Sequence, residues 1–240
     1  MICVLGEPED DDALWVAAAL THRGERVEFV LSEDLMVGSR LSCRVETQTA
    51  SASLALRDGR TLDDRGLELV VNRLGDLPAL GGGSSPADAA YQQEEWRAAL
   101  AAWLRILHCP VVNPPWAASL QGPVLPSMAW RAAGAAHGLP AAPWRSGEDV
   151  PADAELVELI CLGGRCFGAR GAAQEMLSQP LGALAASVGV PLLGATFVRD
   201  GGRWVLLDAT VRPRLAAAGM PLIDALIDCA RQRQAAPWTD

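Results

Sequence analysis

Apolar and polar stretches alternate at the start of the chain in the order expected of an α/β sheet. Apolar runs at 1–5 and 27–31 predict two strands, and the segment 13–23 between them predicts a helix that ends before Gly24. The acidic residues 10–12 stand where a helix needs an N-cap. A strand, a helix and a second strand in this order predict a parallel pair with the helix on one face.

A different pattern follows, in which polar and apolar residues alternate one by one. It predicts half-buried strands at 42–49 and 52–57, and Asp58-Gly59 then indicates a tight hairpin turn. The elements predicted after this turn are an apolar strand at 67–72, a helix at 88–108 with one apolar stripe, a strand at 109–113 and a short helix at 128–137.

Hairpins dominate the remainder of the chain. Residues 140–154 are rich in Pro, Ala and acidic residues and predict a linker. The elements predicted after it are strands at 156–162, 166–170, 192–199 and 203–208, a helix at 172–188 broken near Pro180, and a closing helix at 221–234. We therefore predict an α/β fold with an α+β second lobe, divided into a domain at 1–115, a connecting helix and linker at 116–154, and a second lobe at 155–240.

Composition excludes several classes of function. The 240 residues include 20 basic and 29 acidic side chains, a net charge of −9, and every basic residue is arginine. Without lysine the chain has no Walker-A phosphate loop, no Schiff-base lysine and no kinase-type Lys–Glu pair. Nucleic-acid binding depends on clustered positive charge, so no nucleic-acid partner is expected of an acidic chain.

Localisation and thiol chemistry follow from the same composition. The start of the chain lacks the basic region of a signal peptide, and no apolar run has the ~20 residues of a membrane span, so we expect a cytoplasmic protein with no membrane partner. The six cysteines contain no CxxC and are expected to be reduced. His22, His108 and His137 lie far apart near predicted helix ends, so no catalytic residue is assigned.

Four passages, in order, resemble passages of the ATP-grasp ligase superfamily. They are closest to its glutathione-synthetase-like branch and to the branch that macrocyclises ribosomal peptides to graspetides. The passages are LRDGRTLDDRGLELVVNRLGDLP (56–78), YQQEEWRAALAAWLRILHCPVVNPPWAA (91–118), SMAWRAAGAAHGLPAAP (127–143) and VGVPLLGATFVRDGGRWVLLDATVRP (188–213). The chain thus resembles a shortened, degenerate member: a Rossmann-like pre-ATP-grasp domain followed by a reduced ATP-grasp C-terminal lobe that lacks the nucleotide-enclosing subdomain.

The resemblance implies that the machinery of the ligases is mostly replaced. Met128 stands where the family has a phosphate-binding Lys at a helix start. Thr196, Asp208 and Thr210 stand where it has Asp, Glu and Asn as Mg²⁺ ligands, so one carboxylate remains and metal binding is doubtful. Phosphoryl transfer depends on such positioning and charge. No cofactor is expected, and ATP and Mg²⁺ apply only if ligase activity survives.

Three functions remain open at this point. The first is a binding or scaffolding partner, without ligase activity, in a peptide-modifying or natural-product pathway. The second is an ATP-dependent carboxylate–amine ligase completed by a partner chain, and the third is a small-ligand sensor. A protein partner or a homodimer is expected, and a peptide or amino acid is a possible ligand.

Candidate binding residues follow two strands. Asn72 and Arg73 end an apolar strand, where α/β sheets bind ligands, although Asn there also caps loops. Asn113 precedes Pro114-Pro115 and is either a further ligand-binding candidate or the residue that satisfies backbone groups in the turn.

The remaining candidates are charged residues of the second lobe and three tryptophans. Arg212 and Arg214 form either an anion clamp or ordinary surface charge, and Asp208 is either a metal ligand or part of a surface ion pair. The candidate interface residues, chosen because Trp is enriched at interfaces, are Trp116, Trp130 and Trp144.

Overall fold

A computed structural model describes residues 1–232 apart from 37, 48–49, 76, 79–84, 118, 142–149, 151–153 and 169–170. The chain divides into two compact units. Unit 1 contains Met1–Gly122 and the chain from Ile223 onward, and unit 2 contains Pro123–Leu222. Within the described residues, no helix combines the length and the apolar character required to cross a bilayer.

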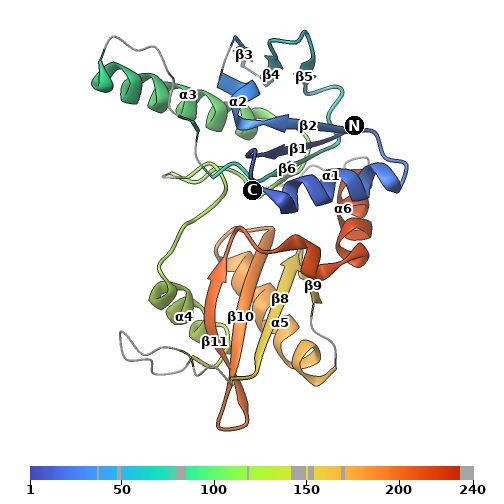
Figure 1. The fold of residues 1–240 in the computed structure, drawn as a ribbon, viewed down its shortest axis with the longest axis vertical. Helices are drawn as coiled ribbons and strands as arrows, with labels where there is room; N and C mark the ends of the chain where they lie inside the picture. Colours follow the sequence, from blue (N-terminus) through green and yellow to red (C-terminus); the bar gives the residue numbers. More distant parts are fainter. Residues whose placement is uncertain are drawn as a thin grey trace. The chain divides into compact units, whose positions relative to one another are not determined.

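A parallel four-stranded sheet lies at the centre of unit 1 (Figure 1). Its strands, in spatial order, are β2 (Val27–Leu31), β1 (Ile2–Gly6), β6 (Leu69–Asn72) and β7 (Val111–Val112). All three pairings are parallel, which confirms the predicted β-α-β opening. Strand β1 has β2 on one side and β6 on the other, so connections leave toward opposite sides of the sheet at this point. In parallel sheets this switch point lies at the carboxyl ends of the strands, here those of β1 and β6.

Helices cover both faces of this sheet. The helices of unit 1 are α1 (Asp11–His22), the short α2 (Ser32–Met36), α3 (Pro86–Ile106) and α6 (Met220–Gln232). Cys3 and Leu5 of β1 belong to the same buried cluster as Leu100 and Trp103 of α3. The closing helix α6 is tied to the region of α1 by ion pairs from Arg23 to Asp224, at 2.9 Å, and from Arg231 to Glu25, at 3.1 Å.

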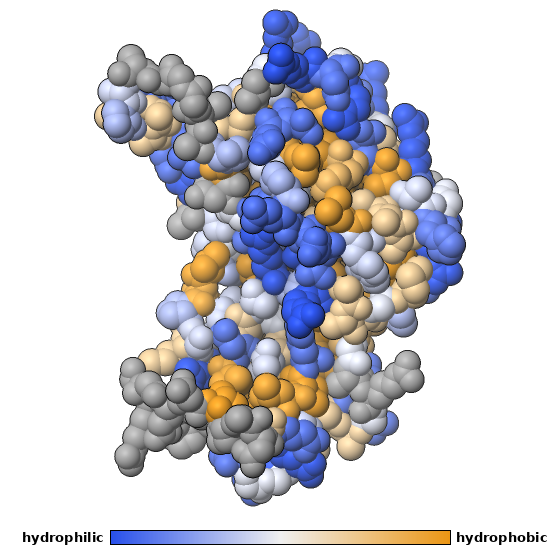
Figure 2. Space-filling view, in the orientation of Figure 1, coloured by the Kyte–Doolittle hydropathy of each residue, from blue (hydrophilic) through white to orange (hydrophobic). Residues whose placement is uncertain are grey.

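A small antiparallel sheet packs on the other side of α3. Its strands, in spatial order, are β3 (Arg40–Val45), β4 (Ala50–Ala55) and β5 (Thr61–Asp63). One face carries Leu54 and Leu62, which are buried with α3, and the other face is polar, as the predicted alternation requires. Figure 2 shows mainly hydrophilic residues over α2 and these strands.

Unit 2 is an antiparallel sheet with two helices packed against it. Its strands, in spatial order, are β11 (Arg203–Thr210), β10 (Leu192–Asp200), β8 (Leu156–Leu162) and β9 (Arg165–Gly168). The helical elements are α4 (Ser127–Ala136), α5 (Ala172–Ser187) and a 3-10 turn at Leu215–Ala218. Gly134 lets α4 lie close to β11, since a Cβ there would stand 2.6 Å from Leu206 Cδ2.

The structure differs from the sequence-based expectations at three places. Helix α4 packs on β11 within unit 2 and is not a separate connection, and α6 belongs to unit 1 from Ile223 onward. Helix α5 continues through Pro180, so the predicted break is wrong. Leu177, Leu181 and Leu184 on α5 are buried, and this packing outweighs the ~3 kcal/mol that an interior proline costs.

Candidate functional site

The carboxyl edge of the parallel sheet, where Asn72 and Arg73 were predicted to bind a ligand, is occupied by an internal ion pair. Arg73 Nε donates to Asp10 Oδ2 at 2.8 Å and Arg73 Nη2 donates to Asp10 Oδ1 at 3.0 Å, with side chains only 4% and 3% exposed. Asp10 also caps α1, since its Oδ1 accepts from the backbone N–H of Ala13 at 3.1 Å. Arg73 therefore fixes the start of α1 against the end of β6.

Asn72 ties a neighbouring loop to the same edge. Its amide nitrogen donates to the carbonyl of Asn113 at 2.8 Å and also to the carbonyl of Leu120, and its Oδ1 accepts from the N–H of Leu74 at 3.3 Å. Asn113 is fully buried and has φ +57°, a left-handed conformation that Asn tolerates. These contacts favour the loop-capping alternative over a ligand-binding role for Asn72, Arg73 and Asn113.

The position that the resemblance associates with Mg²⁺ lies on the sheet of unit 2. Thr196 of β10 faces Asp208 of β11 on one side and Glu158 of β8 on the other. All three side chains are half-buried. Glu158 is not among the predicted site residues, although a single carboxylate between Val157 and Leu159 in an apolar strand is a usable signal.

This row does not fit a magnesium–nucleotide site. Thr196 supplies a hydroxyl where the ligases have a carboxylate, and the two carboxylates sit two strands apart, about 10 Å between Cα atoms. Mg²⁺ requires near-octahedral oxygen ligands at about 2.1 Å. Met128, in the first turn of α4, is 72% exposed and offers no charge to a phosphate.

The remaining predicted residues fall into different environments. Arg212 is half-buried, and its backbone N–H donates to Thr210 Oγ1 at 3.0 Å, whereas Arg214 is exposed and precedes the 3-10 turn. Trp116 is 50% exposed and stays an interface candidate. Trp130 is 1% exposed within the core of unit 2, so its prediction as an interface residue is wrong. Trp144 lies outside the described residues.

The cysteines are free thiols within the described residues, and two of them face each other. Cys161 and Cys166 are direct partners in the β8–β9 hairpin. A hydrogen bond between the two thiols lowers the pKa of Cys161, and that same contact together with burial raises the pKa of Cys166. Cys3 is fully buried, and desolvation raises its thiol pKa far above the ordinary value. No group of three metal-binding side chains occurs in the described part of the chain.

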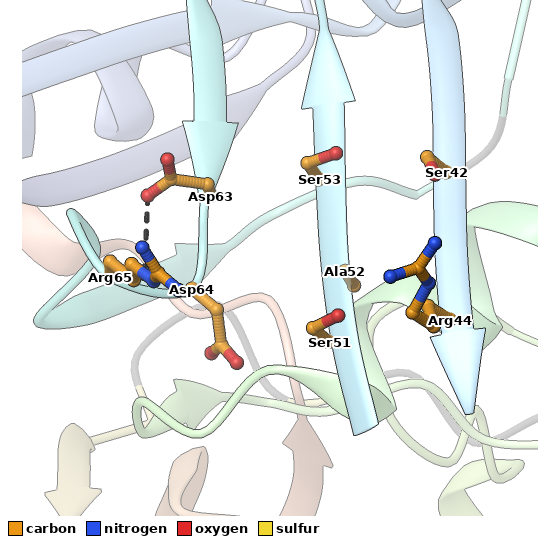
Figure 3. Close-up of a pocket in the computed structure, with 8 residues that line it drawn as sticks. All are labelled: Ser42, Arg44, Ser51, Ala52, Ser53, Asp63, Asp64 and Arg65. Carbon is orange, nitrogen blue, oxygen red and sulfur yellow. Dashed lines mark hydrogen bonds between the residues drawn. The ribbon is translucent and has the colours of Figure 1, made fainter. Parts of the chain in front are cut away.

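A polar concavity of about 370 Å³ lies on the outer face of the β3–β4–β5 sheet (Figure 3). Serines form its floor, because Ser42, Ser53 and Asp63 are aligned across the three strands and Arg44 faces Ser51. The sequence pattern predicts half-buried strands here but no binding site. The residues that line the concavity are Ser42, Arg44, Ser51, Ala52, Ser53, Asp63, Asp64 and Arg65.

The charges in this concavity are not equally available. Asp63 Oδ1 accepts from the backbone N–H groups of Arg65 at 3.1 Å and Gly66 at 2.8 Å. Asp64 accepts from the backbone N–H of His108 at 2.6 Å and contacts its imidazole. The guanidinium groups of Arg44 and Arg65 make no ion pair or hydrogen bond with any described residue. The cationic groups of this face are therefore the ones open to a ligand.

Comparison with solved structures decides the fold. The macrocyclase MdnB from Microcystis aeruginosa MRC matches over 96% of this chain and 97% of its own, with 14% identity and a TM-score of 0.63. The macrocyclase MdnC from the same source, bound with precursor peptide MdnA, matches over 95% and 100%, with 9% identity and a TM-score of 0.69. This chain has the fold of these macrocyclases.

A third match identifies this fold as the ATP-grasp fold. The RiPP-associated ATP-grasp ligase of Chryseobacterium gregarium, in complex with ADP and with a leader and core peptide, matches over 100% of this chain and 98% of its own, with 8% identity and a TM-score of 0.63. No protein-family model matches the sequence, and no curated protein matches it. The ATP-grasp fold of this chain is a reduced one, since residues 140–155 alone connect the α4 region to β8.

Proposed function

We propose that this protein binds a peptide or protein partner in a peptide-modifying pathway and does not itself activate carboxylates with ATP. The fold supports the pathway part of the proposal. Two of the similar proteins were solved with peptides, MdnC with a precursor peptide and the Chryseobacterium ligase with a leader and core peptide. Peptide binding is therefore compatible with this fold.

One observation carries the non-catalytic part of the proposal: among the described residues, the positions that the resemblance associates with Mg²⁺ and with a phosphate-binding lysine hold two separated carboxylates, a threonine and Met128. Met128 is an exposed apolar side chain at the helix start, and Thr196 separates Glu158 from Asp208. The chain has no lysine at all to compensate the triphosphate. Acylphosphate formation depends almost entirely on positioning and on neutralising the charge of the transferred phosphoryl group. Two separated carboxylates around a threonine, with a methionine at the lysine position, provide neither this positioning nor this neutralisation.

The space available for a nucleotide-covering subdomain supports the same proposal. Leu139 is buried in the core of unit 2, and β8 begins at Leu156. A subdomain built from several strands and helices cannot be accommodated between them, since a single strand averages 5–6 residues. A subdomain that closes over a nucleotide normally excludes water from phosphoryl chemistry, and the short connection between Leu139 and Leu156 provides no such cover.

Calorimetric titration with Mg-ATP, together with an ADP-release assay, tests the proposal. We expect no saturable nucleotide binding and no ADP release, with or without acidic peptides. As a matched control, Asp208→Asn is expected to leave both measurements unchanged, because this carboxylate holds no metal in the proposal. ADP release that appears on addition of a second protein, and is lost in Asp208→Asn, would instead establish a ligase completed by a partner chain.

A further inference from the structure

We propose that the exposed edge of β3 is a docking site for an extended peptide segment in which acidic and apolar residues alternate. The inference rests on the proposed peptide-binding function and gives it a location. Strand β3 is at the edge of the β3–β4–β5 sheet and pairs only with β4 among the described strands. An edge strand presents backbone N–H and C=O groups to which another extended chain can hydrogen-bond.

The two faces of β3 carry different chemistry, and this sets the sequence pattern of the partner. Arg40 and Arg44 point to the polar outer face, two positions to either side of Ser42. Cys43 and Val45 point to the opposite face, and both are exposed, Val45 at 73%. Successive side chains of an added strand alternate between the same two faces. An occupant with carboxylates on one face and apolar side chains on the other therefore complements both.

The arginines on β3 are available for such pairing. Neither Arg40 nor Arg44 makes an ion pair or hydrogen bond with any residue that the structure describes. Other arginines of unit 1 are paired, such as Arg73 with Asp10 and Arg97 with Glu94. In a chain of net charge −9, unpaired cations at a strand edge favour an acidic partner over a basic one.

The spacing of the charges favours a peptide over a small anion. Arg40 and Arg44 are four residues apart on an extended strand, about 13 Å between Cα atoms. To contact one carboxylate or phosphate, both arginines would have to bend toward each other along the strand, whereas an extended chain meets each of them with its own side chain, four residues apart. The concavity beside them is open to solvent, and small side chains, the serines drawn in Figure 3, form its floor, so it leaves a small ligand exposed.

The aspartates of the concavity place the occupant at the β3 edge and not across the sheet. Asp63 ends β5 and Asp64 follows it, two strands away from β3. An acidic segment lying over β5 meets these carboxylates and is repelled, whereas one added outside β3 meets Arg40 and Arg44 first. The serines Ser42, Ser51 and Ser53, whose hydroxyls make no hydrogen bond to described residues, lie between the two regions.

The test measures binding of a short fluorescent peptide of alternating glutamate and valine by anisotropy. The full-length protein is expected to bind it more tightly than a matching lysine–valine peptide, and the affinity is expected to fall with added salt. Arg40→Gln and Arg44→Gln are each expected to weaken binding about two- to fivefold. Arg65→Gln, on the β5 side, and Arg203→Gln, in unit 2, are the matched controls and are expected to leave the affinity unchanged.

Two further measurements address the backbone and the small-anion alternative. Hydrogen exchange at residues 40–45 is expected to slow when the peptide binds, because their outward N–H groups gain partners. Inorganic phosphate is expected to compete only through its ionic strength. Competition by phosphate at low concentration, with losses in Arg44→Gln and Arg65→Gln but none in Arg40→Gln, would show an anion pocket and overturn the proposal.

The remaining outcomes separate the location from the function. Peptide binding that is equal in wild type and every arginine variant overturns the β3 site and leaves the peptide-binding function intact. Equal losses in all four variants show general charge attraction and also overturn the site. A wild-type protein that binds neither peptide overturns the site as well, while the non-catalytic part of the proposed function is judged by the nucleotide measurements.

Discussion

Replacing Arg73 by Met tests whether the Arg73–Asp10 ion pair holds unit 1 together. Both side chains are at least 96% buried, and two hydrogen bonds at 2.8 and 3.0 Å join them. Removing one partner leaves a buried, uncompensated charge, which costs about 3–5 kcal/mol. Total stabilities of single domains are about 5–15 kcal/mol, so the loss is a large fraction of what is available. Urea unfolding followed by circular dichroism is expected to show a lower midpoint for Arg73→Met. Hydrogen exchange of the α1 amides is expected to become faster, because the start of this helix loses its fixed position.

A double variant that removes both charges of the Arg73–Asp10 pair tests the role of the pair directly. Asp10→Asn keeps a good N-cap for Ala13 but removes the charge, and combined with Arg73→Met it removes both charges at once. The double variant should cost clearly less than the sum of the two single changes, since neither charge is left unpaired. Arg97→Met, which breaks the half-exposed pair with Glu94, should cost at most about 1 kcal/mol. Additive single effects, or an Arg73→Met cost no larger than that of Arg97→Met, would refute a structural role for the buried pair.

Three further predictions concern the core, helix α5 and the thiols. Trp130→Ala should lower the stability of unit 2 by about 3–5 kcal/mol and Trp116→Ala by less than about 1 kcal/mol, and similar costs in thermal unfolding would contradict the burial of Trp130. Pro180→Ala should stabilise α5 by about 1–3 kcal/mol because it restores a helical hydrogen bond, and a destabilised variant would show that the proline relieves a packing conflict. In native protein near pH 8, iodoacetamide should label exposed Cys43 long before buried Cys3. Because the Cys3 thiol pKa is raised in the folded state, stability should fall as pH rises above the ordinary thiol pKa, where only the unfolded chain releases this proton, and a Cys3→Ala variant should have a smaller slope there.

Local patterns predicted most elements of the fold, and their failures have identifiable causes. The strand β2 was predicted to the residue, and the Asp58-Gly59 turn does join β4 to β5. Helix α5 was predicted as broken because the cost of Pro180 is local, whereas the compensation comes from apolar packing on β8 and β9, which a sequence does not display. Short elements such as α2 have too few residues to produce a periodic pattern.

The roles of charged residues were harder to predict than their positions. Arg73 was correctly placed at the end of a strand, but its partner Asp10 is 63 residues away in the sequence, so the internal pairing could not be foreseen. Glu158 does stand out in the sequence as a lone carboxylate in an apolar strand, but its alignment with Thr196 and Asp208 across three strands is visible only in the structure. The reduced ATP-grasp architecture was predicted because it depends on the order of whole passages, which survives at low identity.

The assignment of α6 to unit 1 has a consequence for biosynthesis. Arg23 and Glu25 cannot form their ion pairs until Asp224 and Arg231 of α6 have been synthesised. During translation, all the strands of unit 2 leave the ribosome before α6 does, so unit 2 has its complete sheet while unit 1 still lacks a helix. A released chain shortened to end before Met220 should therefore keep every strand of unit 2 and lose the α6 ion pairs of unit 1, so limited proteolysis should cut its first half faster than its second.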